Sequence, residues 1–574
     1  MERWMVASKR ADFNAIASRF QIDPVTARLI RNRDVIGEDA IQSYLHGTMD
    51  EIPSPWLLKD MKKAVSILRE KIEDHKKIRI IGDYDIDGVM STYILLKGFQ
   101  RLNANVDTYI PDRVLDGYGM NDQLIERAHE DEIDTIVTCD NGIAAIAQVQ
   151  RAKELGMTVI ITDHHPVKFE ESAEKDGEII YSIPEADAVI DQQQADCSYP
   201  FKGICGAVVA FKLICALYEE FRIPKAELED YYQYAGFATV GDVMELKGEN
   251  RILVKEALRQ LKYSSNLGLR ELIRANHLDE YDRISAYHIG FVLGPCINAS
   301  GRMDTALRAL QLLQAQTQQE AAQIANDLKN LNEERKALTD QWRETAMEMV
   351  ENTDLKNDRV LVVYLPECHE SLAGLIASRL KEKYYKPSIV LTRGANFAKG
   401  SGRSIESYNM NLNLAKCKDL FINWGGHPMA AGVSMEESKI DEFRKRINEL
   451  CELTEEDMTK KVLIDVPMPL SYVSKQLIRE FEVLEPFGNG NEKPVFAQKN
   501  LTPVYARIMG KNRNVLKINL ADDYGNRFDG IYFGDVDAFN EFIEDKGKIA
   551  ITYYPSINSY KGVESIQYII QQYC

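Results

Sequence analysis

The sequence predicts a multidomain α/β protein with a parallel-sheet domain, one long connecting helix, a smaller α/β domain and a C-terminal β-barrel. Three observations predict this fold class. Short β-branched runs alternate with helical segments from about residue 76 and again from Val360. Residues 318–352 contain no proline or glycine and carry apolar residues at helical spacing. Beyond Val462, short β-rich runs alternate with turn residues, as in small barrels.

Length and composition fit a folded enzyme with several cores. A chain of 574 residues is too long for one core, so we expect two to four domains. Hydrophobic residues make up 45% and charged residues 28%. No stretch approaches the roughly 20 uninterrupted apolar residues of a membrane span, and the N-terminus has no apolar leader. We therefore expect a cytoplasmic protein that does not associate with a membrane.

Charge and cysteine content exclude two further classes. The net charge of −18, from 70 basic and 88 acidic residues, argues against a general nucleic-acid coat. It leaves room for a narrow basic channel, because phosphate affinity depends on local basic surface. The nine cysteines are scattered without a C-x-x-C pair, which argues against a disulfide framework or a zinc ribbon.

The first roughly 75 residues are expected to be helical, and apolar spacing predicts a helix from Asp60 to Ile72. After this helix, the spacing of apolar residues changes from a helical pattern to that of a strand. The run Ile78–Ile81 predicts a buried strand, and the apolar stretch Val89–Phe99 predicts the helix that follows it. Residues from about 200 to 315 are expected to be mostly helical.

Acidic and histidine side chains follow successive predicted strands. They are Asp83, Asp85 and Asp87 after the first strand, Asp140 after Thr135–Cys139, and Asp163, His164 and His165 after Thr158–Thr162. A further acid, Asp242, lies in an otherwise apolar segment. Parallel sheets place ligands at these strand ends. Each cluster alone is more often a turn or a helix cap, but their recurrence favours one shared site.

Carboxylates with one or two imidazoles suit Mn²⁺ or Mg²⁺ better than zinc. Two such ions can polarise a phosphoryl oxygen, generate hydroxide and stabilise the leaving oxygen. The residues alone therefore predict a metal-dependent phosphoryl-transfer or hydrolysis site.

The order of these clusters resembles the successive motifs of the DHH phosphoesterase superfamily. By that resemblance Asp140 bridges two ions, Asp85 belongs mainly to one, and His165 lies nearer the substrate phosphate. The resemblance assigns the remaining ligands of the second ion to Asp87, His164 and Asp242. Some members carry a histidine where this chain has Ile81, and Asp83 or a water is expected to take its place.

Further segments resemble the RecJ family of single-strand-specific exonucleases within that superfamily. Segments 110–113 and 117–119, with Tyr118 between the two glycines, and 297–303 match elements expected to hold the strand end. They supply Arg113, Asn298 and Arg302 as substrate-binding residues. Cys296 stands where the family often has arginine, so one phosphate contact is expected to be missing or shifted.

Glycines and an arginine in the smaller α/β domain resemble the substrate motifs of the DHH-associated (DHHA1) domain. The expected contacts are Ser401, Arg403, Gly425, Gly426 and His427. Glycine backbone N–H groups can meet an anion, and arginine can grip phosphate with two hydrogen bonds. Gly-Gly-His alone is more often a turn, but a substrate clamp is favoured in this setting.

The C-terminal segment resembles the RecJ oligonucleotide-binding (OB) domain, through residues 484–496 and 560–567. Such barrels hold single strands through a basic groove and stacked aromatic rings. The candidate contacts are Lys511, Arg513, Lys517, Tyr532, Tyr554 and Lys561, although each tyrosine could equally be core.

The resemblance covers essentially the whole chain and implies five parts. They are a helical N-terminal part of the first lobe (1–75), the DHH domain (76–316), the connecting helix (317–354), the DHHA1 domain (355–454) and the OB-fold domain (455–574).

The implied activity is 5′→3′ hydrolysis of single-stranded DNA to 5′-mononucleotides with two Mn²⁺ or Mg²⁺ ions, in recombination and repair. The catalytic residues would be Asp140, His164 and His165. The resemblance also implies work beside a single-strand-binding protein and a helicase, and we expect a monomer. A nanoRNase or cyclic-dinucleotide phosphodiesterase, a non-catalytic scaffold and an RNA substrate remain alternatives.

Overall fold

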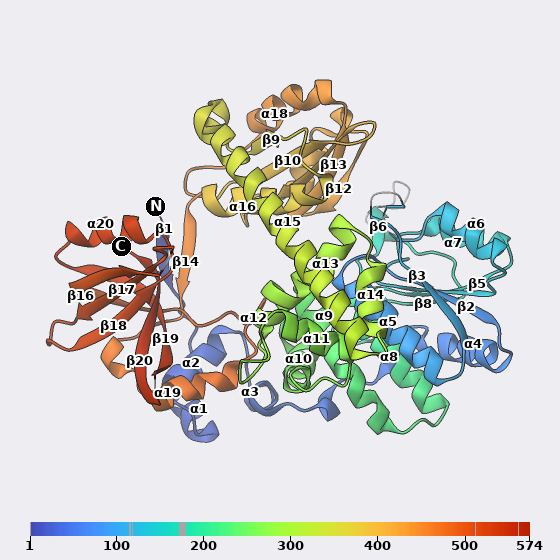
Figure 1. Cartoon of the computed structure of the whole chain (residues 1–574), viewed down its shortest axis with the longest axis horizontal. Coiled ribbons are helices and arrows are strands. Elements are labelled where there is room, and N and C mark those ends of the chain that lie inside the picture. Colours follow the sequence, from blue (N-terminus) through green and yellow to red (C-terminus); the bar gives the residue numbers. More distant parts are fainter. Residues whose placement is uncertain (1, 114–115, 118, 172–178, 511, 561) are drawn as a thin grey trace.

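The computed structural model describes residues 2–113, 116–117, 119–171, 179–510, 512–560 and 562–574. Figure 1 shows the first α/β domain on the right, the second at the top and the C-terminal β domain on the left, with a group of helices between them. Three residues named above, Tyr118, Lys511 and Lys561, lie outside the described residues. Within those described ranges, no helix is both long enough and apolar enough to cross a membrane.

The first sheet is parallel, in the order β3-β2-β4-β5-β8, which confirms the predicted parallel-sheet domain. Its strands are β2 (Lys77–Ile81), β3 (Asn105–Tyr109), β4 (Thr135–Cys139), β5 (Thr158–Thr162) and β8 (Ala188–Ile190). Alternate side chains face opposite sides of the sheet. Ile80 therefore packs with α4 (Met61–Glu73), α5 (Ile86–Arg101) and α8 (Gly206–Glu220). Ile81 packs with α6 (Asp122–Glu130) and α7 (Ile146–Glu154).

The N-terminal segment differs from the all-helical expectation. Strand β1 (Glu2–Val6) pairs in parallel with β14 (Lys460–Ile464), which leads into the C-terminal domain. Helices α1 (Phe13–Phe20), α2 (Pro24–Asn32) and α3 (Glu38–His46) pack with that domain, because their apolar residues share its core. Only α4 packs on the first sheet, so the segment 1–75 is divided between two lobes. Apolar periodicity shows which face of a helix is buried, but not which domain buries it.

The middle of the chain is helical, as expected. Its elements are α9 (Tyr232–Gly241), α10 (Gly248–Leu261), α11 (Leu267–Ala275), α12 (Ala286–His288), the π-helical turn η4 (Ile289–Leu293), α13 (Gly294–Met303), α14 (Leu307–Gln314) and α15 (Gln318–Asn352). Helix α15 is the long connecting helix expected at 317–354, and it extends over residues 318–352. It runs from the central helices to the second α/β domain (Figure 1).

The second α/β domain has a five-stranded sheet in the order β12-β13-β11-β10-β9. The strands are β9 (Leu361–Tyr364), β10 (Ser388–Arg393), β11 (Ala398–Arg403), β12 (Asn423–His427) and β13 (Ala430–Met435). Only the β9–β10 pair is parallel within this sheet, and the other pairs are antiparallel. Helices α16 (Ala373–Tyr384), α17 (Met410–Ala415) and α18 (Ile440–Glu449) complete the domain.

The C-terminal sheet confirms the predicted barrel. Its order is β15-β16-β17-β18-β20-β19, and a further β16–β19 pairing partly closes it. The bounds are β15 (Val466–Pro467), β16 (Phe496–Met509), β17 (Val515–Ala521), β18 (Arg527–Tyr532), β19 (Ile549–Tyr560) and β20 (Val563–Tyr573). Helices α19 (Lys475–Glu480) and α20 (Val536–Glu544) lie within the same domain.

Candidate active site

The turn from β2 into α5 holds three aspartates in different settings. Asp85 caps α5, and its Oδ1 accepts hydrogen bonds from the N–H groups of Asp87 (2.9 Å) and Gly88 (3.2 Å). Asp87 is buried and accepts from the N–H groups of Gly206 (2.7 Å) and Ala207 (2.9 Å) at the start of α8. Asp83 is 2% exposed, and its Oδ1 is buried without a hydrogen-bond partner.

The acid at the end of β4, Asp140, is closely packed against the start of α8. Asp140 is buried in the left-handed region (φ 60°), and its N–H donates to the Thr162 carbonyl (3.1 Å). A Cβ at Gly206 would lie 2.8 Å from the Asp140 Cβ, so only glycine lets α8 approach this strand end. The start of α8 therefore supports both Asp87 and Asp140.

Of the histidine pair after β5, His164 faces the carboxylates of the acidic cluster. The Nε2 of His164 lies 3.1 Å from Asp140 Oδ1, 3.6 Å from Asp87 Oδ2 and 3.8 Å from Asp242 Oδ2. Burial lowers the pKa of His164, which favours the neutral ring that metals bind. Asp242 caps the C-terminal end of α9, which explains how a helix contributes to a site built on strand ends.

Asp163 is a site residue that we had grouped with the histidines but not given a role. It accepts from the Nδ1 of His165 (2.7 Å) and from the backbone N–H groups of Ile143 (2.9 Å) and His164 (2.7 Å). Burial lowers the pKa of His165, but the hydrogen bond and charge of Asp163 outweigh it and raise that pKa to about 9. The signal in the sequence was the carboxylate directly before the histidine pair.

The ligand atoms fall into three groups whose members lie within 4.8 Å of one another. The groups are Asp83, Asp85 and Asp140; Asp87, His164 and Asp242; and Asp140, His164 and His165. Asp140 belongs to two of them. Ile81 is buried in β2, and Asp83 takes part in the first group instead.

The chemistry of this donor set fits divalent cations. Burial and the neighbouring carboxylates raise the pKa of Asp83 and Asp140 well above the usual range, and that of Asp242 to about 8. So many buried carboxylates repel one another unless positive charge lies between them. The unpartnered Oδ1 of Asp83 offers one more oxygen to such a charge.

Three predicted arginines converge beside the acidic cluster. Arg302 donates to the Ser371 carbonyl (2.7 Å), and the Arg113 guanidinium lies 4.7 Å from the centre of the Tyr84 ring. Burial and the charge of Arg113 lower the pKa of Arg302 to about 10 and also lower that of Arg403. Arginines that affect one another's charge in this way are close enough to be candidates for binding an anion together.

Arg335 of α15 is a fourth arginine that sequence reasoning missed. Its charge contributes to the lowered pKa of Arg302, and its guanidinium donates to Asn332 Oδ1 (2.9 and 3.2 Å). The helix was predicted, but periodicity could not show that this turn faces the site. Cys296 is buried beside it and its thiol donates to the Val292 carbonyl (3.2 Å), so this position packs between helices.

Asn298 has a contact that differs from the expected one. Its Oδ1 accepts from the N–H of Ile86 (2.8 Å), at the turn that carries the aspartates. The Asn298 side chain thus supports the backbone that carries the aspartates. Its contact with substrate stays a prediction.

The two glycine-rich motifs of the second domain flank one strand. Ser401 and Gly425 are both paired with Gly432 of β13, and Arg403 and His427 are both paired with Ala430. Directly opposed residues of antiparallel strands point to the same face, so the two motifs share one surface. Gly426 has φ 152°, and a Cβ there would lie 2.4 Å from the Ala430 carbonyl oxygen. The Arg403 guanidinium donates to Ser401 Oγ (3.2 Å).

The C-terminal barrel changes the set of aromatic candidates. Tyr554 is buried, and Tyr532 packs against Phe539 and Tyr573 at ring distances of 4.9 and 5.7 Å. Tyr554 is therefore a core residue, and Tyr532 is partly buried against the core. Arg513 and Lys517 are exposed, and they pair with Asp537 (3.4 Å) and Asp529 (3.7 Å).

The outer face of β16 carries the residues that sequence reasoning missed. Tyr505 is 61% exposed, and Arg507 is exposed opposite Lys517 of β17. Their alternation with Ala506 and Ile508, which are partly buried against the barrel core, was the available signal.

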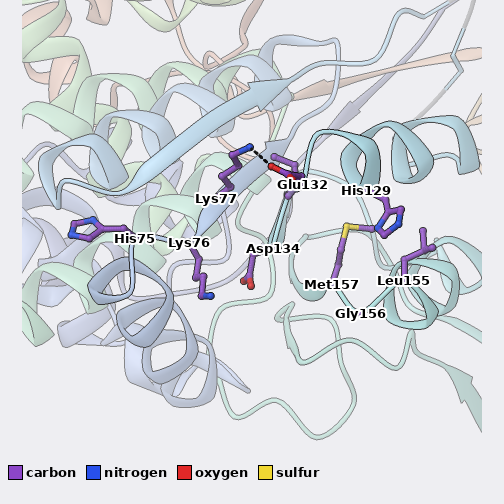
Figure 2. A pocket seen from close by; sticks show the side chains of 10 residues that line it. His75, Lys76, Lys77, His129, Glu132, Asp134, Leu155, Gly156 and Met157 are labelled. Atoms are coloured by element: carbon purple, nitrogen blue, oxygen red, sulfur yellow. Dashed lines mark hydrogen bonds and ion pairs between the residues drawn. The ribbon is translucent and has the colours of Figure 1, made fainter.

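A separate pocket of about 490 Å³ lies at the opposite edge of the first sheet (Figure 2). It is lined by residues such as Lys77, Asp134 and Met157, which stand at or next to the starts of β2, β4 and β5. Lys77 and Glu132 form an ion pair across its rim (3.5 Å). The strand-end acids therefore lie at the other end of the sheet from this pocket.

Comparison with known proteins agrees with this architecture. Three family models match: the DHH family N-terminal domain (residues 77–241), the DHHA1 domain (357–453) and the RecJ OB domain (464–572). The fold and the acidic cluster thus define a metal-dependent phosphoesterase of the DHH class.

The relatives narrow that class. The chain is 33% identical to the single-stranded-DNA-specific exonuclease RecJ of Bacillus subtilis, over 99% of this chain and 70% of the relative. It is 30% identical to the Escherichia coli protein of that name, over 96% of each. The chain belongs to the RecJ family.

Solved structures agree. RecJ of Thermus thermophilus in complex with Mn²⁺ superposes with a TM-score of 0.84 at 27% identity, over 100% of this chain and 79% of that one. Its complex with Mg²⁺ gives a TM-score of 0.78 at 26% identity, over 100% and 78%.

Proposed function

We propose that this chain is an exonuclease that hydrolyses single-stranded DNA from the 5′ end and releases 5′-mononucleotides. One observation carries the proposal: the acids of three strand ends and Asp242 meet beside an arginine cluster, in a chain related over its whole length to RecJ exonucleases. The acids supply a metal site and the arginines supply a phosphate site.

Two Mn²⁺ or Mg²⁺ ions would be held by the acidic cluster. Asp83 and Asp85 would serve one ion, and Asp140 would lie between both. The second ion would take Asp87, His164 and Asp242. When bound, such ions activate water and neutralise charge on the phosphoryl group, so no covalent intermediate with the protein is expected.

The chain's own residues would orient the strand. Arg113, Arg302 and Arg403 would bind phosphate oxygens, with Arg335 as an additional contact. His165, held as a cation by Asp163, would donate a hydrogen bond to the phosphate under attack. The surface shared by Ser401, Gly425, Gly426 and His427 would bind the strand end.

The C-terminal barrel would hold the strand further from the cut. Tyr505, Arg507 and Lys517 supply the exposed ring and positive charge that single-strand-binding barrels use. We further propose that the protein acts in the cytoplasm as a monomer, in recombination and repair, beside a single-strand-binding protein and a helicase.

The test is a time course on long single-stranded DNA labelled at either end, with Mn²⁺, Mg²⁺ or chelator. We expect immediate, metal-dependent release of a 5′-labelled mononucleotide, and no release from blunt duplex. Attack from the 3′ end would overturn the polarity. Cleavage of only the shortest oligomers would favour a nanoRNase, and equal rates on RNA would remove the DNA preference. Tight binding without cleavage would favour a scaffold.

A further inference from the structure

A stacked pair of exposed aromatic rings lies on the helical segment that carries Arg302. The ring centres of Tyr287 and Phe291 are 4.9 Å apart, and their planes differ by 24°. The two residues are 62% and 66% exposed. Leaving two large rings in water forgoes the free energy of burial. Two such rings side by side offer an apolar surface to a flat ligand.

Neighbouring contacts fix the backbone just before this pair and the histidine beside Tyr287. The Tyr281 ring meets His288 edge-on at 5.0 Å, and His288 Nδ1 accepts from the N–H of Ser285 (3.1 Å). The Lys262 ammonium donates to the carbonyls of Tyr281 (2.5 Å) and Asp282 (3.1 Å). A surface already fixed loses little conformational entropy when a ligand binds.

Helix geometry aligns the pair with the phosphate site. Helix α12, the π-helical turn η4 and helix α13 are continuous from residue 286 to 303. At about 100° per residue, positions 287, 291 and 302 fall on one side of this segment. Phe291 lies about 10 Å along the axis from Asn298, at roughly 1.5 Å per residue, and Asn298 contacts the acidic turn through Ile86.

The other end of the segment meets the C-terminal domain. Arg283 lies 3.6 Å from Glu482 and 3.4 Å from Glu485, which lie between β15 and β16 of that domain. Asn489 donates to the carbonyl of Val243, the residue after Asp242 (2.7 Å). In Figure 1, α12 is on the side of the central helices that faces the C-terminal domain. The aromatic pair therefore lies on a segment that follows a contact with the C-terminal domain and leads to the residue that contacts the acidic turn.

We propose that Tyr287 and Phe291 form a base-stacking platform for the strand, a few nucleotides inside the end that is cleaved. This rests on the proposed function. The axial distances of about 10–16 Å from Phe291 to Asn298 and Arg302 correspond to about three to five nucleotides at the roughly 3.4 Å spacing of stacked bases. Every base has a flat face, so the platform would tolerate any sequence.

The first test replaces both rings. Binding of 5′-phosphorylated single-stranded DNA is measured by fluorescence anisotropy in chelator, where no cleavage interferes, with Y287A/F291A beside the wild type. Loss of the platform is expected to weaken binding roughly tenfold. The matched control Y287F/F291Y keeps both rings and should bind as the wild type does. The variant Y287L/F291L keeps apolar bulk without rings and should lose binding like the alanine variant.

The second test needs no variant to fold. Wild-type protein is given strands that lack the bases at about the third to sixth nucleotides from the 5′ end, or at a matched number of positions near the 3′ end. We expect the first substitution to weaken binding and the second to have little effect. Y287A/F291A should not distinguish the first strand from an intact one.

The outcomes separate the two proposals. If the wild type does not degrade single-stranded DNA, the proposed function fails. If the wild type degrades it but binding depends neither on the rings nor on the bases near the 5′ end, the platform alone is refuted. Full binding by the leucine variant would also refute stacking, because aromatic rings would then not be needed for binding.

Discussion

At the scale of single residues, Asp163 lies outside the three potential metal groups but positions His165, which belongs to one of them. Its carboxylate accepts hydrogen bonds from Nδ1 of the His165 ring and from the backbone N–H groups of His164 and His165. It therefore fixes both the ring and the backbone beside the metal groups. Partners of this kind orient the residues that contact metal or substrate. Sequence alone could predict a carboxylate near the histidines, but not which of their atoms it binds.

We predict that Asp163→Asn lowers the rate of cleavage without unfolding the protein. The amide keeps one oxygen acceptor for the backbone but loses the charge that favours the cationic His165. Loss of a partner of this type typically costs 10–100-fold in activity or metal affinity, about 1.4–2.8 kcal/mol. The measurement is single-turnover cleavage over a Mn²⁺ titration, with the thermal midpoint as the fold control. A rate within twofold of the wild type at every Mn²⁺ concentration would contradict this role.

At the scale of elements, Arg251 of α10 joins parts of the chain that are distant in sequence. It is 2% exposed, and its guanidinium donates to the carbonyls of Tyr44 (3.0 Å), Leu484 (3.0 Å) and Val483 (2.9 Å). It also lies 4.0 Å from the centre of the Tyr44 ring. One side chain thus ties the central helices to α3 and to the start of the C-terminal domain.

Arg251→Ala is therefore expected to destabilise the junction of these lobes by about 3 kcal/mol or more, because the carbonyls of Tyr44, Val483 and Leu484 would lose hydrogen bonds from a buried guanidinium. Arg259→Ala is the matched control, since Arg259 is on the same helix but largely exposed and pairs only within α10. The measurements are the thermal midpoint and limited proteolysis between the lobes. Equal stability of the two variants would show that the Arg251 contacts are dispensable.

Most elements could be predicted from local patterns, because each is decided over a few residues. Strands β2, β4 and β5 and helix α15 follow from β-branched runs and helical spacing. Strand β1 could not be predicted, since its partner β14 lies more than 450 residues away and no residue of β1 itself is buried. The edge strand β3 was missed because it is polar and only partly buried.

The site likewise contains residues that local sequence patterns could predict and residues that they could not. Strand-end acids converge because parallel strands end at one edge, so their meeting could be predicted. Arg335 and Tyr505 could not be identified as candidate DNA contacts. The side of a helix or barrel that would face the DNA depends on how the lobes pack, which local periodicity does not show. Tyr532 and Tyr554 were poor candidates for the same reason: their rings complete the barrel core.

At the scale of the whole molecule, an acidic protein must bind a polyanion through few contacts. The net charge is −18, yet Arg113, Arg302 and Arg403 gather in one place and Arg507 and Lys517 in another. Distant acidic surface is largely screened at physiological salt, where the Debye length is about 8 Å. Local basic clusters therefore decide the affinity for the strand.

The salt dependence of binding should report those clusters. For single strands the slope of log K against log[salt] is about −0.7 for each neutralised phosphate. Arg507→Gln is expected to make the slope shallower by about 0.7, and Glu541→Gln, an exposed acid on α20, should leave it unchanged. The slope is measured by anisotropy in chelator. The same slope in both variants would remove Arg507 from the binding surface.

The proposed function depends most on two assignments: the strand-end acids as the reaction centre, and Asp140 as the carboxylate that would lie between both ions. The most direct measurement compares Asp140→Asn with the wild type, in single-turnover cleavage of 5′-labelled single-stranded DNA with Mn²⁺ and in binding of the same DNA in chelator. We predict that cleavage is abolished while binding is largely retained. Substantial cleavage by the variant at saturating Mn²⁺ would contradict the assignment of this cluster as the reaction centre.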